Sequence, residues 1–241
     1  MAKDLKNLCA YELAFLLHKN KIDPINILEY YLENYYKSNR NIKLSYVNIL
    51  ESRAKKEADL AWRRQREGRR KSFFDGIPIT WKDMIDLKNY PALAGSKIVS
   101  EQRRDSKVKD AKVVTLAKNA GLVSIAKTST VELAFGGIGT NKFFQLPEII
   151  NAKGRFVAGG SSTGAAVAVS HNLAPVSVGT DTAGSIRIPA AWNNLIGFKP
   201  SYGIISTKGI IPLSKTYDTV GFLTKSIKDV NLIFNILGKK N

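Results

Sequence analysis

The sequence predicts an α/β fold, and three observations lead to this prediction. The chain has 241 residues, 44% of them hydrophobic, which suffices to bury one sizeable core. The first 67 residues contain no glycine and one proline, whereas nine of the 18 glycines fall between Gly154 and Gly209. After Asp75, short apolar runs alternate with segments of helical composition, as α/β architecture requires. We therefore expect one domain, with a helical N-terminal layer over residues 1–72 and an α/β core over residues 73–241.

Three helices are expected in the N-terminal layer, and the first two are expected to be amphipathic. In the first two, apolar residues recur at steps of three and four positions, which places them on one helix face; they are Leu8, Leu13, Leu16 and Leu17, then Ile25, Ile27, Leu28, Tyr31 and Leu32. Asp23 and Pro24 suit the cap and first turn of the second helix. A third, heavily charged helix is expected from about Glu51 to Glu67.

The core is expected to contain buried strands and helices in alternation. Apolar runs at residues 77–81, 122–125 and 176–178 have the length of buried strands. Between them, residues 113–119 and 164–170 have helical composition.

The charge balance, 37 Lys+Arg against 20 Asp+Glu, gives a net charge of +17, which suits nucleic acid or another anionic surface. The basic run at residues 63–71 is the one segment typical of a nucleic-acid patch. The alternative is a solvated helix end, where cations also suit the helix dipole. We favour this alternative, because no aromatic residues are interleaved with the basic ones for base stacking, beyond Trp62 just before the run.

The residues that usually hold metals or form disulfides are scarce. Cys9 is the only cysteine, so it cannot form an intramolecular disulfide, and we expect it to pack on a helix face. Two unclustered histidines do not make a zinc site, and no cofactor is expected. The first four residues lack the apolar run of a signal peptide, and no stretch approaches the roughly 18 apolar residues of a membrane span. These features predict a soluble, cytoplasmic protein without membrane contact.

Two segments rich in small residues, 158–169 and 179–190, are the most informative part of the chain. A phosphate-binding loop is one interpretation, but the G-x-G-x-x-G pattern and the Gly-Lys-Ser/Thr ending are both missing. A nucleophile elbow is another, since residues 160–164 match G-x-S-x-G with Ser162 at the centre. That chemistry needs a histidine. His171 would lie at the far end of the helix that Ser162 begins, and His18 precedes the motif, so we do not favour this interpretation.

Together with the segment Trp81-Lys82-Asp83-Met84-Ile85-Asp86, these loops resemble the amidase signature family. Three stretches follow its signature in order and spacing: Gly159-Gly160-Ser161-Ser162 with Gly164, residues 181–187, and residues 197–203. Residues 75–78, 94–96 and 126–136 are similar to flanking family segments, so the similarity extends from about Leu8 to Leu237. The resemblance implies the amidase signature fold, a mixed β-sheet core covered by helices.

The resemblance also implies a catalytic triad of Ser185, a cis Ser161 and Lys82. Ser161 and Ser185 are 24 positions apart, as in the family. The resemblance further implies that backbone N–H groups from Thr182 to Ser185 hold an oxyanion. The remaining implied site residues are Thr182, Ala183 and Gly184 for oxyanion and substrate binding, Ala134 and Gly136 at the substrate entrance, and Ser162, Asp181 and Arg187 in support.

The implied chemistry is consistent with the groups themselves. A serine hydroxyl is a weak nucleophile and needs a base, which here is a lysine that is neutral at working pH. Burial disfavours the ammonium form and lowers a lysine pKa, and Lys82, between Ile79 and Ile85, occupies a plausible buried strand position. Ser161 then relays the proton from Ser185 to Lys82.

Two departures from the family pattern concern single residues, and a third concerns length. Ala158 stands where the family usually has proline, and Ala183 where it often has glycine. Family members run to about twice this length, so we expect a domain that is incomplete at its C-terminus.

Three functions remain open. The first is an amidase that hydrolyses a small carboxamide through an acyl-enzyme. The second is the glutaminase-type subunit of a tRNA-dependent amidotransferase, with nucleic acid as a partner in that case only. The third is an inactive or incomplete member that pairs through an open sheet edge, either with a separate C-terminal-half chain or with itself.

Overall fold

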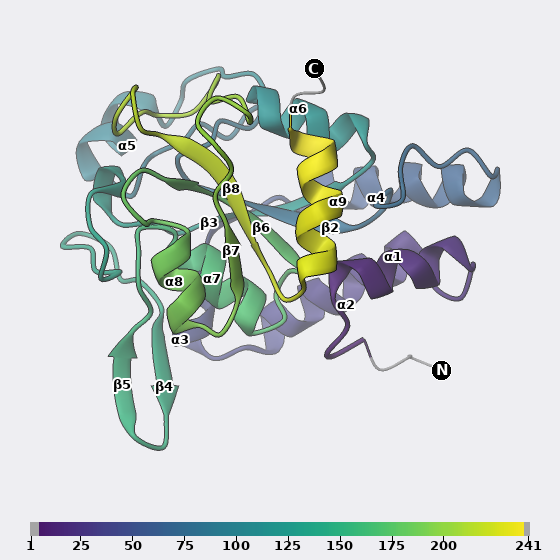
Figure 1. Cartoon of the computed structure of the whole chain (residues 1–241), viewed down its shortest axis with the longest axis horizontal. Coiled ribbons are helices and arrows are strands. Elements are labelled where there is room, and N and C mark those ends of the chain that lie inside the picture. The colour runs from purple at the N-terminus through teal and green to yellow at the C-terminus, as the bar shows by residue number, and fades with distance from the viewer. Residues whose placement is uncertain (1–4, 239–241) are drawn as a thin grey trace.

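The computed structural model describes residues 5–238 (Figure 1). The first four residues, on which the expectation about a signal peptide rests, lie outside the described residues, as do residues 239–241.

The helices of the N-terminal part confirm the amphipathic patterns. The three expected helices are α1 (Ala10–His18), α2 (Pro24–Lys37) and α4 (Glu51–Arg66). The Asp23 carboxylate accepts the Asn26 N–H at 2.8 Å and Pro24 opens α2, which are the usual devices for starting a helix. The short α3 (Arg40–Lys43) and the strand β1 (Tyr46–Ile49) also lie in this part of the chain.

A six-stranded mixed sheet forms the centre of the molecule (Figure 1), as the predicted fold class requires. Its strand order is β1-β3-β2-β6-β8-β7, in which β2 is parallel to β3 and β6, and the other neighbours are antiparallel. The remaining strands are β2 (Pro78–Lys82), β3 (Val123–Thr128), β6 (Val176–Asp181), β7 (Ile196–Phe198) and β8 (Thr219–Thr224). Every residue of β2, β3, β6 and β8 is buried.

Helices pack on both faces of this sheet. On one face, Leu223 of β8 packs against α7 (Thr163–Ser170) and α8 (Arg187–Trp192). Its neighbour Phe222 contacts the ring of Phe198, and Phe198 packs edge-on against Phe234 of α9 (Ile227–Leu237). Because successive strand residues point to opposite faces, α9 covers the face opposite to α7 and α8.

The other elements lie outside the central sheet. They are α5 (Lys97–Arg103), α6 (Lys112–Asn119), a short 3₁₀ helix at Glu132–Ala134, and the strands β4 (Glu148–Asn151) and β5 (Gly154–Val157). β4 and β5 form an antiparallel hairpin that projects from the body (Figure 1). Within residues 5–238, no helix combines the length and hydropathy that a bilayer crossing requires.

The C-terminal ends of β2 and β6 lie side by side in the sheet, because the two strands are parallel and adjacent. Lys82 is the last residue of β2, and Asp181 is the last residue of β6. In α/β sheets, ligands bind beyond the carboxyl ends of such strands. The topology therefore places the two serine-rich loops and Lys82 at one edge of the core.

Candidate active site

The loop before α7 passes close to the rest of the site, which explains its glycines. A Cβ atom at Gly160 would lie 2.9 Å from the Gly139 nitrogen and 3.0 Å from the Gly136 oxygen. Gly159 has a φ of +77°, and a Cβ atom there would lie 2.9 Å from Pro189 Cα. Only glycine combines this backbone conformation with such close approach.

Lys82 lies fully buried, with 0% of its surface exposed. Its Nζ lies 2.7 Å from Ser161 Oγ, 2.8 Å from Thr180 Oγ1 and 3.5 Å from the Thr180 carbonyl oxygen. Burial lowers the pKa of Lys82 to about 7, although the carboxylates of Asp181 and Asp218 act in the opposite direction. A large fraction of Lys82 is therefore neutral near pH 7, as a general base requires.

Ser161 is held by its backbone while its hydroxyl faces Lys82. The Gly160–Ser161 peptide bond is cis. The Ser161 carbonyl accepts the Thr130 hydroxyl at 2.9 Å and the Val131 N–H at 3.2 Å. These contacts join the serine loop to the segment that follows β3.

Ser185 lies in the loop between β6 and α8 and is 8% exposed. Its carbonyl accepts the N–H of Ser162 at 3.1 Å, so the two serine loops are joined through their backbones. Within residues 5–238 the Ser185 hydroxyl makes no hydrogen bond, and in particular none to Ser161 Oγ. This hydroxyl is therefore available to a ligand.

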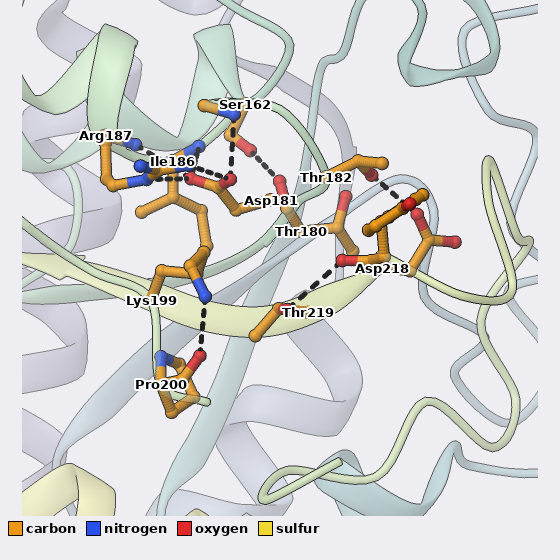
Figure 2. A network of polar contacts seen from close by, with 12 residues as sticks. Ser162, Thr180, Asp181, Thr182, Ile186, Arg187, Lys199, Pro200, Asp218 and Thr219 are labelled. Atoms are coloured by element: carbon orange, nitrogen blue, oxygen red, sulfur yellow. Dashed lines mark hydrogen bonds and ion pairs between the residues drawn. The ribbon is translucent and has the colours of Figure 1, made fainter. Parts of the chain in front are cut away.

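Asp181 organises the loop that carries Ser185 (Figure 2). Its carboxylate accepts the N–H groups of Gly184 at 2.8 Å and Ile186 at 3.1 Å, and pairs with the Arg187 guanidinium at 2.9 and 3.0 Å. Burial raises the pKa of Asp181, but the hydrogen bonds from Arg187 and the backbone outweigh it, so that the pKa lies below its usual value. A charged Asp181 therefore holds the loop at neutral pH.

This network corrects one expectation about the oxyanion donors. The Gly184 N–H already donates to Asp181, so it does not point to a ligand as the resemblance implied. Within the described part of the chain, the N–H groups of Thr182, Ala183 and Ser185 have no hydrogen-bond partner. Three donors therefore remain in this loop.

The Thr182 and Ser162 side chains contact protein groups. The Thr182 hydroxyl donates to Asp218 Oδ1 at 2.5 Å (Figure 2). The Ser162 hydroxyl donates to the Thr180 carbonyl at 3.4 Å and makes no capping bond to α7. Ser162 therefore contacts the backbone of β6 and does not cap α7.

Ala134 and Gly136 lie in a segment that borders the cis-serine loop, which is the loop before α7 that contains the cis Gly160–Ser161 bond. Ala134 is buried and has a φ of +58°, and the Gly137 carbonyl accepts the Gly160 N–H at 2.8 Å. The side chain of Phe135 between them is 80% exposed. The segment therefore places small residues near Ser161, while the large apolar side chain of Phe135 faces solvent.

A second buried lysine lies on the other face of the same strands. Trp81 pairs with Lys127, and Lys82 with Thr128, in the parallel ladder, so Lys82 and Lys127 point to opposite faces. Lys127 Nζ lies 2.6 Å from Asp83 Oδ1 and donates to the Pro91 carbonyl at 2.6 Å. Burial lowers the pKa of Lys127 and raises that of Asp83.

The alternative site chemistries do not fit this geometry. His171 follows α7 at the end opposite to Ser162, and the His18 ring lies against Phe73. The Gly164 N–H donates to the Ser129 carbonyl at 3.0 Å, so the start of α7 is not open to a phosphate. Among the described residues, no group of three or more His, Cys, Asp or Glu side chains could hold a metal ion.

The sequence matches the family of proteins described as "Amidase" over residues 26–241. The chain belongs to the amidase family.

Two curated amidase relatives differ in their reported activities. The chain is 41% identical over 165 residues to the indoleacetamide hydrolase of Pseudomonas syringae pv. syringae, which covers 68% of this chain and 36% of that protein. It is 36% identical over 234 residues to a subunit of the glutamyl-tRNA(Gln) amidotransferase of Acinetobacter baumannii, which covers 97% of this chain and 46% of that protein. The chain thus spans less than half the length of either relative.

Solved amidase structures share the fold. The native peptide amidase of Stenotrophomonas maltophilia superimposes with a TM-score of 0.84 at 29% identity, over 99% of this chain and 49% of that chain.

Proposed function

We propose that this chain carries the serine nucleophile, the relay serine and the lysine base of an amidase that hydrolyses a small carboxamide. The contact of 2.7 Å between a fully buried Lys82 and Ser161 carries the proposal. Neutral Lys82 takes the Ser161 proton while Ser161 takes that of Ser185, whose oxygen attacks the amide carbonyl. The free N–H groups of Thr182, Ala183 and Ser185 are the donors for the oxyanion, where one such donor contributes roughly 3 to 4 kcal/mol.

The leaving amine then receives a proton from the lysine through Ser161, and water hydrolyses the acyl-enzyme. This step requires the Ser185 hydroxyl to come within hydrogen-bonding distance of Ser161 in the complex with substrate, and catalytic hydrogen bonds often shorten in this way. We place this reaction in the cytoplasm.

Covalent labelling tests the nucleophile without requiring full turnover. A fluorophosphonate probe should modify Ser185, as read by mass spectrometry of the intact chain and its peptides. Labelling should be lost in Ser185→Ala and fall by at least tenfold in Lys82→Ala. Ser206→Ala, which removes a hydroxyl that accepts the Lys208 N–H at 3.3 Å, is the matched control and should label normally. Modification of another serine, or undiminished labelling of Ser185→Ala, would overturn the proposal.

A second candidate function, the glutaminase-type subunit of a tRNA-dependent amidotransferase, rests on the 97% of this chain that aligns with the amidotransferase relative. The basic run at residues 63–71 does not support RNA binding, because its arginines contact the protein itself. Arg63 pairs with Asp59, Arg64 with Asp75 and Arg69 with Glu67. Retention of tRNA at low salt would favour this candidate, and its absence would favour the hydrolase.

A third candidate is that a second chain completes the site. Within the described strands β7 pairs only with β8, so one of its edges is free, and such edges commonly pair with another chain. The partner is then either a separate chain that corresponds to the other half of the relatives or a second copy of this chain.

A further inference from the structure

Three oxygen atoms surround the amine of Lys82, and two of them belong to Thr180. Nζ lies 2.8 Å from Thr180 Oγ1 and 3.5 Å from the Thr180 carbonyl, beside the 2.7 Å contact with Ser161 Oγ. Thr180 is 6% exposed, near the end of β6. These groups are therefore shielded from bulk water, which would otherwise compete for the amine.

The number of hydrogens on the amine limits how these contacts can be arranged. A neutral lysine amine has two N–H donors and one lone pair, and a carbonyl oxygen only accepts. One N–H therefore faces the Thr180 carbonyl. If the second N–H donates to Thr180 Oγ1, the lone pair is left for the Ser161 hydroxyl, which is the orientation that a base acting on Ser161 needs.

We propose that Thr180 is a positioning residue, whose hydroxyl and carbonyl take both N–H groups of neutral Lys82 and direct its lone pair at Ser161. This inference rests on the proposed function, since it assigns Thr180 a role in the same proton relay. Ser162 contributes indirectly, because its hydroxyl donates to the Thr180 carbonyl at 3.4 Å (Figure 2).

The charged groups around Lys82 do not take part in its hydrogen bonds to Thr180. Asp181 at the end of β6 and Asp218 before β8 both favour the ammonium form. Asp83 and Lys127 form an ion pair with each other on the opposite face of β2 and β3. The helix α7 carries no charged side chain. A change at Thr180 that leaves these four groups in place therefore tests the hydrogen bond itself.

Thr180→Val removes the hydroxyl while it keeps the size and branching of the side chain. The ammonium form of Lys82 loses a charge-assisted hydrogen bond and the amine only a neutral one, so the pKa of Lys82 should fall by about one unit. It can be read from the chemical shift of ¹³Cε-labelled lysine, with the Lys82 signal assigned by its loss in Lys82→Met. At the same time the rate of probe labelling at Ser185 should fall by about tenfold or more at high pH, since the neutral lysine is misdirected.

Two variants control this experiment. Thr180→Ser keeps the hydroxyl and should retain both the pKa and the labelling rate. Thr80→Val also removes a buried hydroxyl, on the same strand as Lys82, where Thr80 donates to Ser177 at 2.7 Å. It should change neither readout, so a loss caused only by disturbed packing would be recognised.

The outcomes separate this inference from the proposed function. A raised or unchanged pKa of Lys82 in Thr180→Val would overturn it, since the hydroxyl would then donate to the lone pair or make no contact. A normal labelling rate in Thr180→Val would also overturn it. If Ser185→Ala still reacts with the probe while the pKa shift in Thr180→Val is observed, the assignment of Ser185 as the nucleophile is wrong. The contact of Thr180 with Lys82 then still stands.

Discussion

Burial governs the charge of Lys82, because the groups within hydrogen-bonding distance of its Nζ in the described structure are hydroxyl and carbonyl oxygens. Its pKa is about 7 in the fold and about 10.4 in an unfolded chain. Between these values the unfolded chain binds the proton more tightly, so stability should rise with pH in this window. The full cost, on the order of 5 kcal/mol, applies below the folded pKa and disappears above the unfolded one.

Lys82→Met should therefore stabilise the protein at pH 7 and flatten the increase of stability between pH 7 and 10, provided that the new side chain fills the space of the old one. Urea denaturation at a series of pH values measures this. Lys55→Met is the control, since the Lys55 side chain is 66% exposed and should leave the profile unchanged. Parallel profiles for wild type and Lys82→Met would show that the buried lysine keeps its ordinary pKa.

The same pKa should set how reactivity depends on pH. If Lys82 accepts a proton through Ser161, labelling of Ser185 should rise with pH along a limb whose midpoint is about 7, the folded pKa of Lys82. Lys82→Ala should remove the limb as well as most of the rate. A limb with the same midpoint in Lys82→Ala would assign it to another group.

Single residues of the site differ in how far the sequence could predict them. Lys82, Ser161 and Ser185 stand in recognisable motifs, and the structure brings Lys82 and Ser161 into contact. Thr180 and Asp218 were not singled out, because their roles depend on distance in space. Asp218 is 36 positions from Thr182 and carries no local signal. The alternation of β6 indicates that Thr180 and Asp181 point to opposite faces, but not which atoms they meet.

At the scale of elements, the Asp83–Lys127 ion pair joins β3 to the end of β2. Both side chains are almost fully buried, with exposed fractions of 3% and 0%. Lys127→Met leaves Asp83 buried without its partner, so it should cost about 3 to 5 kcal/mol of unfolding free energy. The double variant Asp83→Leu/Lys127→Met should cost less than Lys127→Met alone, since no unpaired charge remains. Urea denaturation measures both, and a cost below about 1 kcal/mol for Lys127→Met would contradict the importance of the pair.

The elements that the sequence predicted are those with a strong apolar pattern. α1, α2 and α4 have amphipathic faces with the helical period, whereas β2, β3 and β6 are buried on both sides and contain short apolar runs. The edge strands β1 and β7 were missed. They have four and three residues, too few to show a period. The β4–β5 hairpin was also missed, because all of β5 is exposed and carries no burial pattern.

At the scale of the whole molecule, large apolar side chains remain exposed around the candidate active site. Leu133, Phe135 and Ile138, in the segment that borders the cis-serine loop, are 43%, 80% and 56% exposed. Single exposed apolar residues are common on proteins, but neighbouring ones usually mark a surface that contacts another molecule. Together with the free edge of β7, this surface predicts that the chain alone associates with itself in solution.

The double variant Phe135→Ser/Ile138→Ser should therefore shift the protein toward monomers. Light scattering coupled to size-exclusion chromatography, over a wide range of concentration, measures the change. The melting temperature should change little, because both side chains lie mostly outside the core and their removal leaves no cavity. Ile227→Ser, at an isolated position of α9 that is 66% exposed, should leave the association unchanged. If the wild-type chain is a monomer at every concentration, this surface does not drive association. If the double variant still associates as the wild type does, the free edge of β7 is the remaining contact.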